Sequence, residues 1–303
     1  MNVPRMQLVL SENWTMTPAR DLPVLVRWAR EAEEAGFDSV MISEHVVLGP
    51  DAGARGRMAN PREYALPGNQ DPFTPWPSPL TLLAAISSVT STLRLAAAAV
   101  LAPLRHPLLL ARELGTLDLL AQGRLIVLPT VSWSRDEYAA LGVDFGRRGR
   151  MLDEHLEIWE LLWRESPVSY HGEFYRFDEV YFEPKAYRPT GPVLWFGGAG
   201  LSEHLLRRVR RWGSGFNPLG YPPAADIEAL LAVRPGLELA GGTRALFPDA
   251  GSCAPLGPAL EHIPQRMAEG YTTFCIKPSQ FLDDPGRVGA FCHEVMRRVR
   301  ALV

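Results

Sequence analysis

Two kinds of hydrophobic pattern alternate along the chain. Short, continuous apolar runs predict buried strands, because parallel strands covered on both faces show no polar alternation. Longer segments repeat apolar residues every three or four positions, which predicts amphipathic helices. The predicted strands are 7–10, 37–43, 93–103, 124–129, 193–196, 213–219, 244–249 and 272–278. The predicted helices are 22–36, 78–90, 106–123, 147–165, 201–211, 224–233, 256–270 and 285–303.

A strand followed by a helix recurs eight times, which is typical of one architecture. It predicts an α/β fold, a (β/α)8 TIM barrel with insertions after strand 2 and before strand 5. The first insertion, 46–77, is rich in Gly, Pro and Arg, and a loop of this length in a compact domain suggests a lid. The second, 167–190, alternates polar and aromatic residues and predicts a hairpin. No internal repeat or linker interrupts the chain, so we expect one domain over 1–303.

Composition narrows the classes of partner. The formal net charge is -3 over 303 residues, which argues against nucleic acid as a main partner. No apolar run approaches the roughly 20 residues that span a membrane. The three cysteines form no close pair, and the first residues lack the apolar core of a signal peptide. We therefore expect a cytoplasmic protein that acts on a small molecule.

In a TIM barrel, functional side chains follow the carboxyl ends of the strands. His45 follows the second predicted strand, where its ring can donate a hydrogen bond or a proton near neutral pH; capping a neighbouring loop is the alternative. Glu12 and Trp14 follow the first strand, and Lys277 and Ser279 follow the eighth.

The other histidines do not form a metal-binding pattern. His106 precedes a proline at a helix start, which favours a structural role, and His155 lies between charged helix neighbours, where we expect it to be exposed. No histidine pair has the spacing of a helical zinc site and no cysteine cluster is present, so we expect no metal.

The fifth strand ends in a glycine-rich turn, "VLWFGGAGLSEHLLRRVRR". A strand, a glycine turn and a helix N-terminus form a natural anion site, so Gly197 and Gly198 are candidates for a phosphate cradle; a plain turn is the alternative. The arginines of the helix, Arg208 among them, are expected to form a solvated face.

Aromatic residues gather at the predicted barrel mouth. Trp14, Phe73, Trp76 and Trp133 suit a flat, largely apolar ring with a phosphate tail, although each also suits the core. The chain has no GxSxG elbow, no phosphate-binding GxxxxGK[ST] loop and no strand-linked GxGxxG fingerprint, which argues against a Rossmann nicotinamide site.

Four stretches carry a family resemblance, and together they span about the first two-thirds of the chain: "AEEAGFDSVMISEHV", "LAPLRHPLLLARELGTLDLLAQGRL", "SRDEYAALGVDFGRRGRMLDEHLEIWELLW" and "PVLWFGGAGLSEHLLRR". The chain resembles the luciferase-like monooxygenase superfamily, and within it the deazaflavin branch that uses coenzyme F420. The resemblance implies a barrel whose cofactor phosphate binds at the fifth-strand turn, to backbone N–H groups of Gly197, Gly198 and Ala199.

The resemblance also implies roles for other residues. His45 matches a histidine that lies beside the reactive ring edge in deazaflavin relatives. The run 96–100 matches the third strand, where relatives carry a backbone bulge that supports the ring face, and Ala98 and Ala99 are small enough to permit that approach. Thr130 is a further cofactor-binding candidate, and Tyr138 matches an aromatic position near the cofactor tail.

The fourth strand departs from the family pattern. Relatives read approximately LGVGxG, whereas residues 127–133 read VLPTVSW. Trp133 stands where some deazaflavin dehydrogenases carry a glutamate, and an indole cannot transfer a proton. This departure disfavours sugar-phosphate dehydrogenase chemistry and favours a more apolar substrate.

These observations predict a reductase that uses reduced F420 to transfer a hydride to an activated C=C or C=N bond. His45 is the catalytic candidate, and Trp14, Trp76 and Trp133 are expected to shape the substrate pocket. Arg55, Arg57 and Arg62 of the lid either meet an acidic cofactor tail or keep the loop soluble. One alternative is a monooxygenase that uses reduced FMN and O₂, and another is a non-catalytic ligand-binding relative. Relatives are often dimers, so a homodimer is an open expectation.

Overall fold

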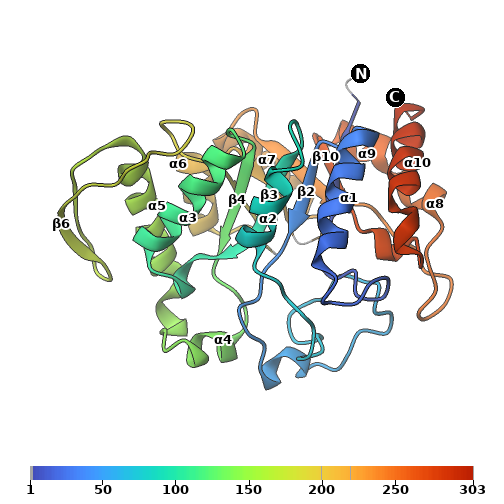
Figure 1. The fold of residues 1–303 in the computed structure, drawn as a ribbon, viewed down its shortest axis with the longest axis horizontal. Coiled ribbons are helices and arrows are strands. Elements are labelled where there is room, and N and C mark those ends of the chain that lie inside the picture. Colours follow the sequence, from blue (N-terminus) through green and yellow to red (C-terminus); the bar gives the residue numbers. More distant parts are fainter. Residues whose placement is uncertain (1–2, 199, 219, 303) are drawn as a thin grey trace.

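The computed structural model describes residues 3–198, 200–218 and 220–302, and it forms a closed parallel barrel surrounded by helices (Figure 1). The barrel strands in spatial order are β1 (Arg5–Val9), β10 (Thr273–Ile276), β9 (Glu238–Gly242), β8 (Gly215–Phe216), β7 (Val193–Phe196), β4 (Leu125–Thr130), β3 (Arg94–Leu101) and β2 (Ser39–Ile42). The predicted TIM-barrel fold is therefore confirmed.

The helices follow the predicted hydrophobic stripes. Their bounds are α1 (Leu22–Ala35), α2 (Pro79–Ser87), α3 (Pro107–Leu120), α4 (Arg135–Ala140), α5 (Arg148–Arg164), α6 (Glu203–Trp212), α7 (Ala224–Val233), α8 (Leu256–Leu260), α9 (Ile263–Ala268) and α10 (Val288–Arg300). The predicted helix 256–270 is two short helices, because Pro264 lies inside it and proline disrupts a helix interior. α4 corresponds to no predicted helix.

The seventh predicted strand was placed incorrectly. Residues 244–249 form no strand, and β9 lies just before them, where it pairs with β8 and β10. The apolar run of β9 is short and ends in Gly241 and Gly242, which resemble a turn in sequence. A Cβ at Gly241 would come within 2.9 Å of the Tyr221 ring, so that glycine serves side-chain packing inside a strand.

The insertion before the fifth barrel strand is the predicted hairpin. β5 (Val168–His171) and β6 (Arg176–Val180) pair antiparallel, outside the barrel. The Glu154 carboxylate of α5 accepts hydrogen bonds from the backbone N–H groups of Glu173 (2.6 Å) and Phe174 (3.1 Å), which joins the hairpin turn to the barrel helices.

The insertion after β2, residues 46–77, lies with α4 at the end of the barrel where the strands finish, the lower end in Figure 1. Its first part contains a short 3-10 helix, η1 (Pro50–Gly53), and is held against α4. The Asp51 carboxylate accepts hydrogen bonds from the Ser134 hydroxyl (3.0 Å) and from the Arg135 backbone N–H (2.8 Å).

The second part of the loop is held on the opposite side by Arg62. Its guanidinium donates hydrogen bonds to the carbonyl oxygens of Gly251 (2.9 Å) and Ser279 (2.7 Å) and forms an ion pair with Asp283. Arg62 is therefore a buried structural group, whereas Arg55 and Arg57 are exposed. The loop is thus attached on both sides of the barrel mouth.

No helix within the described parts of the chain combines the length and hydropathy needed to cross a membrane.

Candidate active site

His45 follows β2 at the barrel mouth, and only 8% of its surface is exposed. Its Nδ1 lies 3.1 Å from Oε2 of Glu137, and its Nε2 lies 3.4 Å from the amide nitrogen of Gln70. The indole rings of Trp76 and Trp133 meet the imidazole edge-on, with ring centres 5.1 and 5.4 Å away. The structure therefore surrounds His45 with groups from two loops and a helix.

Glu137 is the residue that sequence analysis missed. It lies in the first turn of α4 and is fully buried. Besides His45, its carboxylate accepts hydrogen bonds from the Ser132 hydroxyl (2.7 Å) and the Val46 backbone N–H (2.7 Å). Burial acts to raise its pKa, but these three hydrogen bonds outweigh burial and hold the pKa of Glu137 below its ordinary value.

A signal for Glu137 was present in the sequence. Ser134 and Glu137 have the spacing of a capping box, in which a serine caps the helix and the acidic side chain turns back to the cap. Ser134 does cap α4, accepting from the Glu137 backbone N–H at 3.5 Å. The Glu137 side chain turns instead toward His45, and only the fold brings that histidine into reach.

The contacts of His45 assign its tautomer. An ionised carboxylate only accepts hydrogen bonds, so Nδ1 of His45 carries the proton shared with Glu137. Nε2 lies beside the Gln70 side-chain amide, 3.4 Å from its nitrogen. This arrangement keeps the imidazole in one orientation, with Nε2 as the nitrogen that a ligand can reach by displacing Gln70.

The aromatic prediction is met only in part. Trp76 and Trp133 surround His45, and Trp14 is half-buried against the barrel core. The indole N–H groups of Trp14 and Trp76 are buried, and neither has a hydrogen-bond partner among the described residues. Phe73 does not line the mouth, since 89% of its surface is exposed at the loop surface.

The predicted bulge is present in β3. The pairing of β3 with β4 shifts between Ala98 and Val100, and the Ala98–Ala99 peptide is cis. Ala98 is buried and Ala99 is half-buried, and β3 lies in the barrel between β2, which precedes His45, and β4. That the bulge supports a cofactor ring stays a prediction.

A second part of the site lies at the glycine turn between β7 and α6. A cavity of about 170 Å³ is lined there by Pro129, Thr130, Val131, Leu152, Phe196, Gly197, Gly198, Gly200, Ser202, Leu205 and Arg208. Thr130, Gly197 and Gly198 are thus brought together as predicted, while Ala199 lies outside the described residues. Ser202 caps α6 by accepting from the Leu205 backbone N–H at 3.3 Å.

The glycines of this turn have different reasons to be glycine. A Cβ at Gly197 would overlap the carbonyl oxygen of Asn217, so close packing against the residue after β8 excludes a side chain there. At Gly198 the nearest atoms to a Cβ lie 3.6 Å away, and at Gly200 none lies within 4 Å. Gly198 and Gly200 therefore leave space beside the backbone in this turn.

Arg208 corrects the expectation of a fully solvated arginine face on α6. Its side chain is only 12% exposed and lines the cavity at the glycine turn. The guanidinium donates from Nε to the Asp153 carboxylate (2.7 Å) and from Nη2 to the Gly149 carbonyl (2.8 Å). These contacts hold a cation beside the N-terminal half of α6.

Tyr138, His106 and His155 form hydrogen bonds within the protein. The Tyr138 hydroxyl donates to the Val131 carbonyl, and its contact with a cofactor tail stays a prediction. His106 caps α3 by accepting from the Leu108 backbone N–H at 3.3 Å, which agrees with a structural role. His155 is fully buried between carbonyl oxygens of Met151 and Arg105, so the expectation of exposure was wrong.

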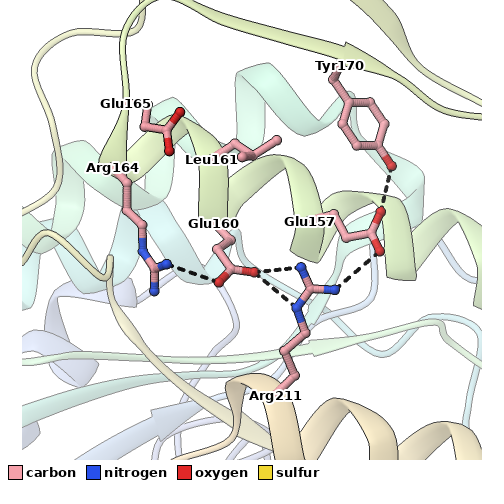
Figure 2. Close-up of a pocket in the computed structure, with 7 residues that line it drawn as sticks. All are labelled: Glu157, Glu160, Leu161, Arg164, Glu165, Tyr170 and Arg211. Carbon is pink, nitrogen blue, oxygen red and sulfur yellow. Dashed lines mark hydrogen bonds and ion pairs between the residues drawn. The ribbon is translucent and has the colours of Figure 1, made fainter.

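A cavity of about 330 Å³ on the outside of the barrel is unrelated to this site (Figure 2). Arg211 bridges Glu157 and Glu160 there, at 3.5 and 3.0 Å, and the Tyr170 hydroxyl donates to Glu157 at 2.9 Å. Figure 2 shows these groups directed at one another. The network joins α5, α6 and the hairpin.

Within the described ranges, no group of three or more His, Cys, Asp or Glu residues is arranged to hold a metal ion.

Comparison with solved structures finds the same fold. EDTA monooxygenase from Chelativorans sp. BNC1 superposes with a TM-score of 0.73 at 16% identity, covering 99% of this chain and 94% of that one. An F420-dependent secondary alcohol dehydrogenase, in complex with an F420–acetone adduct, gives a TM-score of 0.71 at 15% identity, covering 99% and 100%.

Sequence comparison identifies the family. Uncharacterized proteins of Mycobacterium tuberculosis are 36% identical over 205 residues, 66% of this chain and 68% of theirs. An FMNH2-dependent dimethylsulfone monooxygenase of Pseudomonas putida is 28% identical over 137 residues, 44% of this chain and 38% of that protein. The model of luciferase-like monooxygenases matches residues 6–275, so the chain belongs to the luciferase-like monooxygenase family and is an oxidoreductase.

Proposed function

We propose that this protein is a reductase that uses reduced coenzyme F420 and transfers a hydride to an activated C=C or C=N bond of a small organic molecule. The observation that carries the proposal is the His45–Glu137 pair, an imidazole that a buried carboxylate holds in one orientation at the barrel mouth. The F420-dependent alcohol dehydrogenase, which matches over the full length of both chains, supports this choice of cofactor.

The residues present fit a flat, polar-edged ring with an anionic tail. The Trp76 indole N–H and the Gln70 side-chain oxygen are buried beside His45 without a partner among the described residues, and a polar ring edge would give them one. Thr130, Gly198 and Arg208 would hold the phosphate in the glycine-turn cavity. The backbone at Ala98 and Ala99 would support the ring.

When bound, reduced F420 supplies a hydride from its C5 carbon. His45 would direct Nε2 to the ring edge or to the substrate, because Glu137 holds its other nitrogen. Trp76 and Trp133 would exclude water from the reacting atoms, and the 46–77 loop would close the mouth over them.

A second candidate is a monooxygenase that uses reduced FMN and O₂. The observation that favours it is the match to FMNH2-dependent dimethylsulfone monooxygenases from two Pseudomonas species. The same glycine-turn cavity and the same bulge would suit FMN, because the two ring systems have similar shapes. The chemistry differs, since a deazaflavin carries hydride but does not activate O₂ as a flavin does.

The two candidates are separated by a binding titration. The purified protein is titrated in parallel with F420 and FMN, each oxidised and reduced, while ring absorbance and fluorescence are followed. We expect F420 to bind at least ten-fold more tightly than FMN. Tight binding of FMN alone would replace the proposal with the monooxygenase, and binding of neither would indicate a non-catalytic relative.

A further inference from the structure

A lysine is buried at the barrel mouth beneath the 46–77 loop. Lys277 follows β10 and is fully buried. Its ammonium donates a hydrogen bond to the Glu63 carbonyl oxygen (2.8 Å) and lies 3.8 Å from the Glu12 carboxylate. A buried cation is costly unless it is well paired, and this one has a distant counter-ion and a single hydrogen bond among the described residues.

A tyrosine of the same loop covers this lysine. The Lys277 ammonium lies 4.8 Å from the centre of the Tyr64 ring. The Tyr64 hydroxyl is buried and has no hydrogen-bond partner in the described part of the chain. Burial raises the pKa of Tyr64 well above its ordinary value, and nearby Cys275 and Glu12 raise it further, so the phenol keeps its proton near neutral pH. Leaving such a donor unpaired costs about 1–3 kcal/mol.

The Tyr64 hydroxyl and the Lys277 ammonium form a donor pair, of which the hydroxyl is left without a partner by the described part of the chain. A phenol O–H and an ammonium, both buried at the mouth of the barrel, favour an oxygen atom on which negative charge develops. The Glu12 carboxylate, with 15% of its side chain exposed, lies 3.8 Å from the ammonium. Nothing in the His45–Glu137 pair requires these groups, so they call for a separate role.

We propose that Tyr64 is a catalytic residue that donates a hydrogen bond to a carbonyl oxygen of the substrate, and that Lys277 is its positioning residue. The inference rests on the proposed function and deepens it, because it names the substrate class: α,β-unsaturated carbonyl compounds, in which the carbonyl group activates the C=C bond.

The reaction balances with the reduced deazaflavin as reductant. The β-carbon of the substrate gains the hydride, the C=C π bond breaks, and its electron pair becomes an enolate. The Tyr64 hydroxyl donates a hydrogen bond to the enolate oxygen and keeps its own proton, while the Lys277 ammonium over the Tyr64 ring holds the phenol in place. Water gives a proton to the α-carbon and leaves hydroxide, so the substrate gains one hydride and one proton in total and becomes the saturated carbonyl product.

An oxyanion probe tests the site without turnover. The protein, with and without oxidised F420, is titrated with para-nitrophenolate, which mimics the enolate oxygen, and with nitrobenzene, which lacks that oxygen. We expect Tyr64→Phe to weaken para-nitrophenolate binding at least ten-fold and to leave nitrobenzene and F420 binding unchanged. Tyr181→Phe, at a tyrosine that is 74% exposed, is the matched control.

The variant is expected to fold, because the Tyr64 hydroxyl forms no hydrogen bond that the substitution would remove. Lys277→Met is expected to shift the absorbance of bound para-nitrophenol from the phenolate toward the phenol form, which a purely structural lysine would not change. Equal binding of the two probes by the wild-type protein, or equal para-nitrophenolate binding by wild type and Tyr64→Phe, would overturn the proposal.

Turnover separates this inference from the proposed function. With cyclohex-2-en-1-one and reduced F420, Tyr64→Phe is expected to lower kcat about 100-fold with little change in KM, as for loss of one oxyanion donor. If F420 does not bind, the proposed function fails, while the probe titration without cofactor still tests the donor pair. If F420 binds and kcat is unchanged in Tyr64→Phe, only the role of Tyr64 fails.

Discussion

At the scale of single residues, the site depends on a hydrogen bond between side chains 92 positions apart, His45 and Glu137. The carboxylate is fully buried and ionised, and three donors surround it. It selects the imidazole tautomer and leaves Nε2 toward the mouth. A group of this kind acts through its partner, as orienting carboxylates do in other enzyme sites.

The first prediction concerns Glu137→Gln, which preserves shape but removes the charge. The amide can hydrogen-bond either form of the ring, so we expect His45 to populate both tautomers, which ¹⁵N NMR of the imidazole measures directly. A single tautomer in the variant would show that the carboxylate does not select it.

The same variant has a pH signature. Because the folded-state pKa of Glu137 lies below its ordinary value of 4.5, its ionised form stabilises the protein above that value, and this stability is lost as pH falls through the folded-state pKa. We expect Glu137→Gln to reduce the free energy of unfolding by about 1.5–3 kcal/mol at pH 7, the range for hydrogen bonds to charged groups, and by less at low pH. Urea unfolding at several pH values measures the difference.

At the scale of elements, the 46–77 loop is a structured cover rather than a free loop. Asp51 attaches its first part to α4, and Arg62 and the Lys277–Glu63 hydrogen bond attach its second part to the segment after β10. The Gln70 side chain of the same loop contacts the His45 ring. Any opening of the barrel mouth must break some of these contacts.

The second prediction tests this attachment with a matched pair of arginines. Arg62→Met removes a buried guanidinium that bridges three carbonyl groups, whereas Arg57→Met removes one that is 74% exposed in the same loop. We expect hydrogen exchange of the loop amides to accelerate at least ten-fold in Arg62→Met, about 1.4 kcal/mol of local opening. Equal exchange in both variants would show that Arg62 does not hold the loop.

At the scale of the whole molecule, closure of the barrel depends on charges at the end opposite the site. Arg94, the first residue of β3, donates hydrogen bonds to Asp38 beside β2 (2.8 Å) and to Glu238 of β9 (2.9 Å). Burial acts to raise the pKa of Glu238, but the hydrogen bond from Arg94 outweighs it and the pKa is lowered. β2 and β3 are neighbours in the barrel, whereas β9 is adjacent to neither, so the clamp joins separated parts of the barrel.

The third prediction is a loss of global stability in Arg94→Met. Removing Arg94 leaves the two carboxylates with the half-exposed Arg5 as their remaining cation, so we expect the free energy of unfolding to fall by about 3 kcal/mol. Arg27→Met, at a surface pair with Glu31, is the control, with an expected change below about 0.5 kcal/mol. Chemical unfolding measures both, and similar losses would contradict a role for the clamp.

Much of the architecture could be predicted because it is encoded locally. Continuous apolar runs and helical stripes identify the strands and helices of the barrel. The glycine turn, His45 and the two insertions can each be recognised from the residues of a short segment. The incorrect predictions have local causes as well. Gly241 and Gly242 make the end of β9 resemble a turn, Pro264 divides a predicted helix in two, and the charged neighbours of His155 suggested an exposed ring.

By itself, the sequence determined the barrel, the family and the candidates at each strand end, because hydrophobic period and turn chemistry act over a few residues. Only the tertiary structure decided which of those candidates meet. It joined Glu137 to His45, placed Tyr64 over Lys277, turned Arg208 toward the glycine turn and left Phe73 outside. Such pairings depend on strand order and barrel closure. No short-range pattern in the chain encodes the distance between two side chains that are far apart in the sequence.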